Sequence, residues 1–382
     1  MTIHKVKSGE TLSDIANFYG LCEGTLAEIN GLEGGKIAVG EELLVLVPTR
    51  VHTARHGDSV ERLCLRYKVR KSDVLAFNPS LCQRRLEIGE RVALKFDERA
   101  YGMAATNGYV YKGTSAEALE LALPYMTYAT FASVYADASG IHAIYNEEPL
   151  LKKAISASKI PLIRIHDKYT ERYENEEMQS NFCEEIIELA KGRGYKGIVL
   201  NSVLFSHSAD YYMRFLMNLK KQMIGSDLIL ITECDENSQK SICDLSDGCI
   251  LSYTAIGRDN IPSFEDGEKK AIADFACECE SIKSFVDIPS FARCDDEYIE
   301  IENAKNQARS SNAEIFFDEV SLLSKFQAKN KSYAYPSLSS IKAVLELLSE
   351  YGYMGISFDV SKTPKVFLMM YNAMYKTVCA AL

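Results

Sequence analysis

The sequence predicts an α/β protein in which two small βααβ modules precede a (β/α)8 TIM barrel. Two observations predict this fold class. An internal repeat with a shift of 48 to 49 residues fills the N-terminal quarter, and short apolar runs alternate with amphipathic helical stretches over the remainder. At about 100–200 residues per domain, a chain of 382 residues holds several domains. We divide it at residues 1–49, 50–97 and 98–382.

Composition excludes several classes of protein. The net charge of −10 argues against a nucleic-acid partner. No apolar run reaches the roughly 18 residues of a membrane-spanning helix, and Met1–Lys5 lacks the apolar core of a secretory signal peptide. The 11 cysteines are odd in number and irregularly spaced, which is typical of free thiols in a reducing compartment. We therefore expect no metal and no cofactor.

The repeat sets the element order of each module. In the first copy, a short strand leads to a tight turn at Gly9, and Thr11 is placed to cap the helix that follows. Apolar residues recur at helical spacing over 12–19. A second short helix is predicted over 25–29, and a closing strand over 43–47. The second copy repeats this order.

The hallmark pattern G-[DE]-[ST]-[LV], a helix-ending Asn and a late [VI]-G all occur twice, and this pattern resembles the LysM module. The resemblance implies binding of N-acetylglucosamine polymers such as peptidoglycan and chitin. It places the sugar between the first turn and the loop after the second helix. The residues at those positions are Gly9, Glu10, Thr11, Asn30 and Gly31 in the first copy, and Gly57, Asp58, Ser59, Asn78 and Pro79 in the second. The alternative is that these residues only build turns. Two linked modules would raise the effective affinity for a polymer.

Eight apolar runs after residue 98 are the predicted barrel strands. They lie at 107–111, 125–135, 160–165, 197–203, 228–232, 248–253, 284–288 and 355–358. Unbroken apolar runs suit parallel strands that are buried on both faces. Two of the intervening helices are predicted at about 176–193 and 210–224. Eight βα units over about 280 residues fit a closed barrel, and a doubly wound sheet is the alternative.

Several motifs in this part resemble glycoside-hydrolase family 18. They are the segment 107–111, the D-x-x-G turn at 137–140, Gly194–Gly197, Leu251–Tyr253 and Tyr351–Phe358. Two N-terminal LysM-like modules before such a barrel resemble the spore-cortex N-acetylglucosaminidases of spore-forming Firmicutes. By this resemblance the protein is made in the cytoplasm of the mother cell, without a signal peptide, and becomes associated with the spore or cell wall.

The family's catalytic motif is replaced in this sequence. Family 18 enzymes carry D-x-x-D-x-D-x-E on the fourth strand, where the Glu protonates the leaving oxygen and the last Asp orients the substrate's acetamido nucleophile. Lys196, Val199, Asn201 and Val203 stand at the four carboxylate positions, and residues 194–208 contain no Asp or Glu. Asn201 can still hydrogen-bond an acetamido group, whereas Val203 cannot deliver a proton.

Other residues remain candidates for a barrel cleft. Tyr253 keeps the Tyr of the family's M-x-Y-D motif, and Asp359 stands at or beside the position of its sugar-stacking Trp. Asp167 and Glu233 lie near predicted carboxyl ends of strands, where barrel active sites form, and are candidates for relocated acids. The alternative is that these carboxylates cap helices or lie on the surface, and then they would have no role in catalysis.

The resulting hypothesis is a glycan-binding protein whose barrel, a pseudo-glycoside hydrolase, acts as a lectin or scaffold. Its partners are then a peptidoglycan or chitin-like glycan and, as further candidates, other spore-coat or cell-wall proteins. One alternative is an active N-acetylglucosaminidase-like hydrolase that uses Asp167 or Glu233. Another is a barrel with an unrelated substrate, since fold alone does not decide function.

Overall fold

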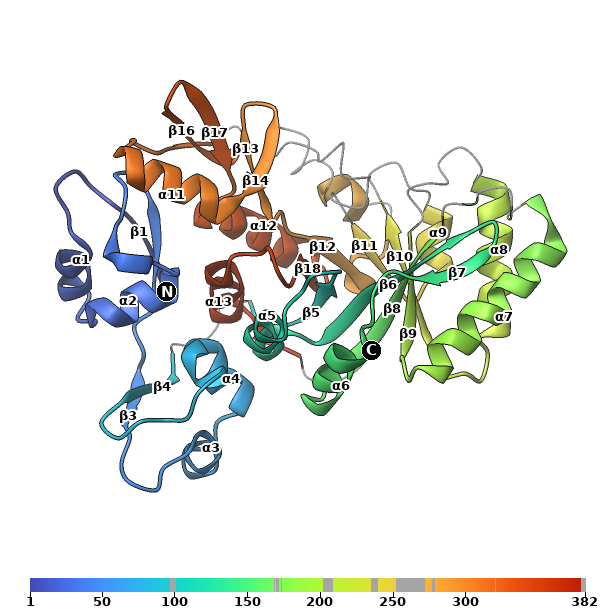
Figure 1. Ribbon diagram of the computed structural model, residues 1–382, viewed down its shortest axis with the longest axis horizontal. Coiled ribbons are helices and arrows are strands. Elements are labelled where there is room, and N and C mark those ends of the chain that lie inside the picture. The colour runs from blue at the N-terminus through green and yellow to red at the C-terminus, as the bar shows by residue number, and fades with distance from the viewer. Residues whose placement is uncertain are drawn as a thin grey trace.

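The structure is a computed structural model that describes residues 1–96, 101–167, 169, 172, 174–201, 209–234, 240–251, 272–276, 279–319 and 321–378. Its described part consists of two small modules, a barrel and a small antiparallel sheet with one helix (Figure 1). No helix in the described ranges is long and apolar enough to cross a bilayer.

The first module has the predicted βααβ order. Its elements are β1 (Thr2–Lys5), α1 (Leu12–Phe18), α2 (Glu23–Asn30), the 3-10 turn η1 (Glu33–Gly35) and β2 (Glu42–Val45). Strands β1 and β2 pair antiparallel. Thr11 caps α1 as predicted, because its side chain accepts from the N–H of Asp14 while the Asp14 carboxylate accepts from the N–H of Thr11.

The second module repeats the first. Its elements are β3 (Arg50–Thr53), α3 (Val60–Tyr67), α4 (Lys71–Phe77), η2 (Pro79–Cys82) and β4 (Arg91–Lys95). Strands β3 and β4 pair antiparallel, and the Ser59 side chain caps α3. Each module therefore closes a small apolar core between its helices and its two-stranded sheet.

The large domain is a closed parallel barrel, as predicted. Its strands are β5 (Met103–Val110), β6 (Tyr128–Asp137), β8 (Ile160–Asp167), β9 (Gly197–Asn201), β10 (Ile229–Cys234), β11 (Gly248–Leu251), β12 (Ser284–Asp287) and β18 (Gly355–Asp359). Each pairs in parallel with the next, and β5 pairs with both β6 and β18, which closes the ring. All eight predicted strands are confirmed, and the doubly wound alternative is wrong. Two short strands pair alongside the barrel strands: β7 (Gly140–Ala143) is antiparallel to β6, and β19 (Lys376–Thr377) is parallel to β5.

Helices surround the barrel (Figure 1). They are α5 (Ala116–Ala122), η3 (Leu123–Tyr125), α6 (Glu148–Ser156), α7 (Glu176–Gly192), α8 (Ala209–Gln222), α9 (Lys240–Leu245), η6 (Ser281–Lys283), α12 (Leu338–Tyr351) and α13 (Lys365–Met374), and residues 272–276 are also helical. The two helices predicted from periodicity correspond to α7 and α8. One apolar cluster lies inside the ring, and a larger one lies between strands and helices. This explains why the strands are apolar on both faces.

A second sheet lies between β12 and α12 and was not predicted from the sequence. It consists of β13 (Phe291–Cys294), β14 (Glu297–Glu300), β15 (Phe316–Asp318), β16 (Leu323–Ala328) and β17 (Lys331–Tyr335), with helix α11 (Ile301–Ser311) packed on it. The strands pair antiparallel in the order β14-β13-β17-β16-β15. Its strands are short and partly polar, so they lack the unbroken apolar runs that mark the barrel strands.

The first module packs against the large domain. Glu41 forms a buried ion pair with Arg309 of α11, with 2.6 Å between Oε1 and Nη2. The Glu42 carboxylate accepts from both the N–H and the hydroxyl of Ser339, at 2.8 and 2.6 Å. The backbone N–H of Ile315 donates to the Val39 carbonyl at 2.9 Å.

The second module is attached in the same way. Arg70 donates to the carbonyl of Thr377 at 3.1 Å, and the Tyr125 hydroxyl donates to the carbonyl of Ala76. The two modules also touch each other, since the N–H of Ser80 donates to Glu28 at 3.1 Å. Both modules are therefore parts of one packed molecule (Figure 1).

Candidate functional site

The first turn of the first module is held by an acidic residue from the hallmark pattern. Gly9 has φ +85°, a conformation that favours glycine. The Glu10 carboxylate accepts from the N–H of Lys7 at 2.7 Å and lies 3.0 Å from Nε2 of His4. The hydrogen bond from Lys7, followed by that from His4, lowers the pKa of Glu10. The other His4 nitrogen, Nδ1, lies 3.2 Å from the Tyr19 hydroxyl.

The second module repeats these contacts. The Asp58 carboxylate lies 2.8 Å from Nε2 of His52 and accepts from the N–H of Arg55 at 2.9 Å. The hydrogen bond from His52 is the largest cause that lowers the pKa of Asp58 to about 2. Nδ1 of His52 lies 2.9 Å from the Tyr67 hydroxyl. Sequence reasoning missed the two histidines, although the repeat shift relates His52 to His4.

The two helix-ending asparagines link a helix to a strand. The Asn30 side chain donates to the carbonyls of Leu26 and Leu44, both at 2.9 Å, and accepts from the N–H of Leu44 at 2.7 Å. The Asn78 side chain makes the same three bonds to Val74 and Ala93. Because Asn30 is buried, its side chain stabilises the module. The glycan contact predicted for Asn30 stays a prediction.

The loop after the second helix lies against the start of the first helix. A Cβ placed on Gly35 would lie 3.8 Å from the side chain of Leu12, which directly follows Thr11. The predicted groove residues on the first module surface are Gly9, Thr11 and Gly31. In the second module, Gly57 is exposed, Asp58, Ser59 and Asn78 are half-buried, and Pro79 is buried. Their contact with a glycan stays a prediction.

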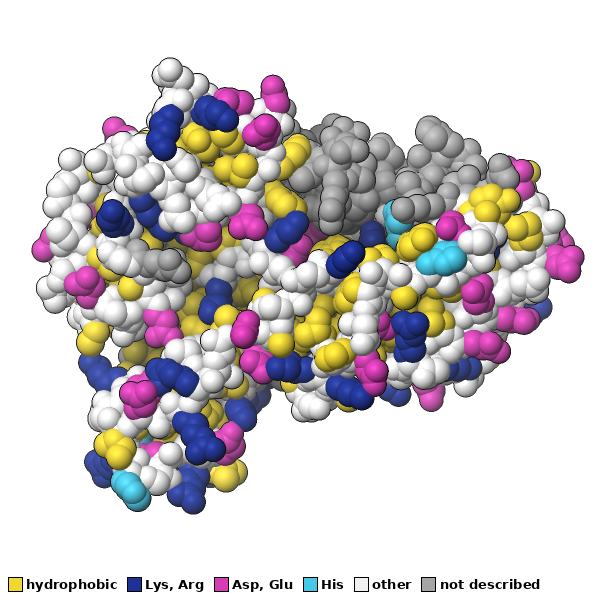
Figure 2. All heavy atoms as spheres, in the orientation of Figure 1, with side chains coloured by type: hydrophobic (Ala, Val, Ile, Leu, Met, Phe, Trp, Pro, Cys, Tyr) yellow, Lys and Arg dark blue, Asp and Glu magenta, His cyan; other side chains and the backbone are white. Residues whose placement is uncertain are grey.

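The second module has a basic surface. Residues 50–97 include 11 Lys and Arg against six Asp and Glu, within a chain whose net charge is −10. Figure 2 shows dark blue side chains gathered on this module, whereas both signs are interspersed over the barrel. The exposed basic side chains are Arg50, Arg55, Arg62, Arg66, Lys68, Lys71, Arg84, Arg85, Arg91 and Lys95.

The segment that the sequence analysis aligns with the family 18 motif begins before the fourth barrel strand, β9 (Gly197–Asn201), and continues along it. Val199 is fully buried among the apolar side chains inside the ring. Asn201 lies two residues further along the same face, at the carboxyl end, and is 4% exposed. Lys196 is exposed before the strand begins. Val203 and the cleft candidate Tyr253 lie outside the described residues.

Glu233 lies beside Asn201 on the neighbouring strand β10, in register with it. Arg164 donates to both of its carboxylate oxygens, from Nε at 2.6 Å and from Nη2 at 2.7 Å, and the Tyr109 hydroxyl donates to it at 2.6 Å. Glu233 is 1% exposed. Burial alone would raise its pKa, but the charge and hydrogen bonds of Arg164 and the hydrogen bond from Tyr109 outweigh burial and lower the pKa. The carboxylate is therefore ionised at neutral pH.

The other carboxylates proposed for the cleft also have structural partners. Asp167 pairs with Nε of Arg172 at 3.1 Å and accepts from the N–H of Tyr169 at 3.0 Å. Asp359 accepts from the N–H groups of Ser361 and Lys362, at 2.8 and 3.1 Å, and so caps the turn after β18. Both carboxylates therefore have local structural roles in the folded chain.

The sequence does contain a signal for the ion pair inside the barrel. Arg164 interrupts the apolar run of its strand, and it shares the inward face with Leu162. A charge at an inward barrel position requires a partner of opposite sign. Sequence reasoning considered Glu233 only as an acid, without the arginine that pairs with it.

Comparison with known proteins identifies the first module. The family model described as LysM domain matches residues 4–45. The curated protein described as putative sporulation-specific glycosylase YdhD of Bacillus subtilis is 22% identical over 244 residues, which are 60% of this chain and 57% of that protein. This chain therefore aligns with little more than half of the curated relative.

Comparison with solved structures identifies the fold. The spore cortex-lytic enzyme SleL of Bacillus cereus matches over 99% of both chains, with a TM-score of 0.77 and 18% identity. A GH18 chitinase from Cycas revoluta, solved in complex with (GlcNAc)3, covers 71% of this chain and 99% of its own, with a TM-score of 0.59 and 14% identity. The chain is thus a LysM domain followed by a closed barrel of the GH18 fold. The arrangement matches SleL over the full length.

Proposed function

From a LysM domain joined to a barrel of the GH18 fold, we propose that the protein binds an N-acetylglucosamine polymer through its N-terminal modules. We further propose that its barrel does not hydrolyse glycosidic bonds by the GH18 mechanism. The binding proposal is supported by the repetition of the same turn, histidine and asparagine contacts in both modules. Function rests on such local geometry rather than on the fold.

The observation that carries the second proposal is the fourth strand. The substrate-assisted reaction requires a general acid and a carboxylate that orients the acetamido group. Val199 and Asn201 occupy two of the four motif positions on β9, and neither can ionise. General acid catalysis is typically worth about 10²–10⁴-fold in rate, so loss of both carboxyl groups would leave negligible turnover. The barrel would then act as a lectin or scaffold.

The second candidate is an active glycosidase with relocated acids. One observation favours it, because Glu233 lies in register with Asn201, one strand away from the motif. Its pairing with Arg164 opposes the role of general acid, since the lowered pKa keeps the carboxylate without a proton. Asp167 is likewise held in an ion pair, with Arg172. We therefore rank this function second.

The basic surface of the second module favours an anionic polymer. Peptidoglycan carries carboxylates on its peptide stems, whereas chitin is neutral, so we propose peptidoglycan, and spore cortex in particular, as the ligand. Two similar proteins are named for sporulation or the spore cortex. We accordingly place the protein at the spore or cell wall after synthesis in the mother cell, where spore-coat proteins are further candidate partners.

Binding is tested by co-sedimentation of the full-length protein with insoluble peptidoglycan and with chitin. The Gly31→Asn variant adds a side chain to the proposed groove at a left-handed position, with φ +62° and no neighbour within 4 Å. Asn tolerates this conformation. The matched control is Gly20→Asn, because Gly20 has φ +68° and is equally open. Gly20 follows the carboxyl end of α1, whereas the proposed groove lies at the start of that helix. We expect at least about tenfold weaker retention of the Gly31 variant, because simultaneous binding by two modules is disrupted.

Equal retention of the two variants would overturn the proposed groove. Retention on peptidoglycan should also fall as salt rises from about 0.05 to 0.5 M, because exposed charges are screened, and retention on chitin should change less. Salt-independent retention on both polymers would remove the argument for an anionic ligand.

Hydrolysis is tested by incubation with cortex fragments and chitin oligomers. We expect no new reducing ends. Turnover that disappears on Asp167→Asn, or on Glu233→Gln in protein whose circular dichroism shows that it is still folded, would establish the glycosidase instead.

A further inference from the structure

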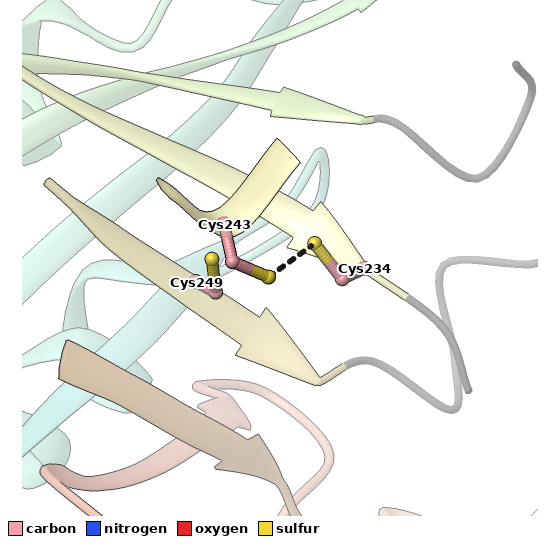
Figure 3. A group of neighbouring side chains, drawn as sticks. All are labelled: Cys234, Cys243 and Cys249. Carbon is pink, nitrogen blue, oxygen red and sulfur yellow. Dashed lines mark hydrogen bonds between the residues drawn. The ribbon is translucent and has the colours of Figure 1, made fainter. Parts of the chain in front are cut away.

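Four cysteines that are scattered along the sequence meet on the outer side of the barrel. Cys234 ends β10, Cys249 lies on β11, and Cys243 lies on α9, which packs over them (Figure 3). Cys279 follows the helical residues 272–276. All four side chains are buried, with 0% to 6% exposed. Sequence analysis predicted no metal site here, because these cysteines show no paired C-x-x-C spacing.

The sulfur atoms lie at distances close to those of a metal site. Those of Cys234, Cys243 and Cys249 all lie within 4.8 Å of one another, and Cys234 and Cys243 are 4.0 Å apart. The sulfur of Cys279 lies 2.6 Å from that of Cys243. A tetrahedral zinc with Zn–S bonds of about 2.3 Å holds its sulfur ligands about 3.8 Å apart. Cys234, Cys243 and Cys249 are thus already grouped as three ligands would be, and the sulfur of Cys279 would have to move away from that of Cys243 to serve as the fourth.

The surroundings suit thiolate ligands. The hydroxyl of Thr232 lies 3.7 Å from the sulfur of Cys234 and 3.5 Å from that of Cys249, close enough to hydrogen-bond a thiolate. The Thr232 hydroxyl is also hydrogen-bonded to the hydroxyl of Ser246, with 2.9 Å between the two oxygens. Hydrogen-bonding groups around the ligands orient them and tune their affinity for the metal.

A cation would change the protonation of the cluster. A bound divalent ion compensates the charge, so each ligating thiol loses its proton when the metal binds.

We propose that Cys234, Cys243, Cys249 and Cys279 bind one zinc ion in a structural site. Four sulfur ligands leave no open coordination position, and the burial of the cluster keeps substrate away, so the site is not catalytic. The metal would join the carboxyl end of β10, helix α9, β11 and the segment before β12. The proposed zinc site does not depend on glycan binding or on hydrolysis.

The test is the metal content of the full-length protein, purified without a histidine tag and without chelators. We expect elemental mass spectrometry to find one zinc ion per chain. The protein should also bind added Co²⁺, with a thiolate-to-cobalt charge-transfer absorption and the visible bands of a tetrahedral ion. Both measurements use the unmodified chain, so they do not depend on the folding of a variant.

Variants locate the metal. Cys243→Ser and Cys249→Ser should lose zinc, whereas Cys183→Ser, a matched control on α7 with an equally buried thiol outside the cluster, should retain it. Thr232→Val keeps all four thiols but removes the neighbouring hydroxyl. It should weaken zinc binding by about 10- to 100-fold in competition with a chromophoric chelator.

Three results would overturn the proposal. The first is a wild-type chain without zinc and without the cobalt spectrum. The second is zinc retained equally by both cluster variants. The third is a disulfide between Cys243 and Cys279, found by peptide mapping under non-reducing conditions in a metal-free chain, which would make the cluster a redox pair.

Discussion

At the scale of single residues, the barrel interior depends on one ion pair. Glu233 and Arg164 are 1% and 12% exposed, and Arg164 contacts both oxygens of the carboxylate. A buried ion pair adds little net stability compared with apolar residues, but removal of one partner leaves the other charge buried without compensation. This asymmetry makes the pair a sensitive test of the structure.

Glu233→Gln should lower the free energy of unfolding by about 3–5 kcal/mol, because Arg164 remains buried without its counter-charge. Urea denaturation measures the change. Glu188→Gln, on the exposed side of α7, is the control and should change stability by less than about 0.5 kcal/mol. A loss no larger than that of the control would contradict the buried pair.

The acidic residue at the turn of the second module predicts a pH dependence. The pKa of Asp58 is lowered to about 2 in the folded chain, with the hydrogen bond from His52 as the largest cause, and an unfolded Asp has a pKa of about 3.9. The carboxylate therefore contributes stability that is complete above about pH 4 and is lost as the pH falls toward 2. Thermal unfolding of the wild-type chain and of Asp58→Asn is compared between about pH 2 and 6. The variant should lack the loss of stability that protonation of Asp58 causes below about pH 4. Identical pH profiles for the two proteins would refute it.

The sequence predicts only part of the candidate sites. The turn glycines and capping residues are found from the repeat, because their roles depend on neighbours close in sequence. The partners of Glu233 and the four cysteines come from different strands and helices, so their contacts depend on how the barrel closes. A single charged residue within an apolar run, such as Arg164, is the kind of sequence signal that can predict a buried ion pair.

At the scale of elements, each asparagine at the end of a module's second helix connects that helix to the closing strand. Asn30→Ala removes two hydrogen bonds between α2 and β2 and one within α2, and it leaves the buried backbone N–H and carbonyl of Leu44 without the side chain to which they bond. At about 1 kcal/mol for each bond, and more for an unsatisfied buried group, we expect a loss of about 2–4 kcal/mol.

Hydrogen exchange measures this loss locally. Amides of α2 and β2 should exchange faster in Asn30→Ala, whereas Asn17→Ala, at an exposed position on α1, should leave them unchanged. Unchanged protection of β2 in both variants would show that the asparagine does not hold the module together.

The sequence predicts those strands that are buried along most of their length. All eight barrel strands are mostly apolar and mostly buried on both faces, and this signal is independent of the order in which they pair. The inserted sheet was missed because its strands are short and its edge strand β14, Glu297–Glu300, is mostly exposed and polar. A sequence of this kind has the composition of a loop, and pairing with β13 makes it a strand.

At the scale of the whole molecule, the first module is fixed by a buried ion pair to the inserted sheet's helix. Glu41 is 1% and Arg309 is 7% exposed. Sequence resemblance treats modules and barrel as separate units, so this contact, between residues 268 positions apart, could not be predicted from it.

Glu41→Gln should detach the module partly from α11, since it leaves Arg309 with an uncompensated buried charge. We expect a loss of about 3–5 kcal/mol, with faster hydrogen exchange in β2 and α11 together. Glu302→Gln is the matched control, because Glu302 is 41% exposed and lies 3.9 Å from the same arginine. Equal exchange in the two variants would argue that the module is held by other contacts.

The attachment of both modules has a consequence for selectivity. Modules on flexible linkers sample many separations, and their second binding step depends on the average over those separations. Here the bond from Ser80 to Glu28 and the contacts with the large domain keep the two modules, and with them the two proposed grooves, at one separation. A glycan strand whose repeat matches that separation can occupy both grooves without a further loss of chain entropy. Strands with another spacing or crosslinking pattern would reach only one groove, so the protein would discriminate between wall polymers by their periodicity as well as by their sugar.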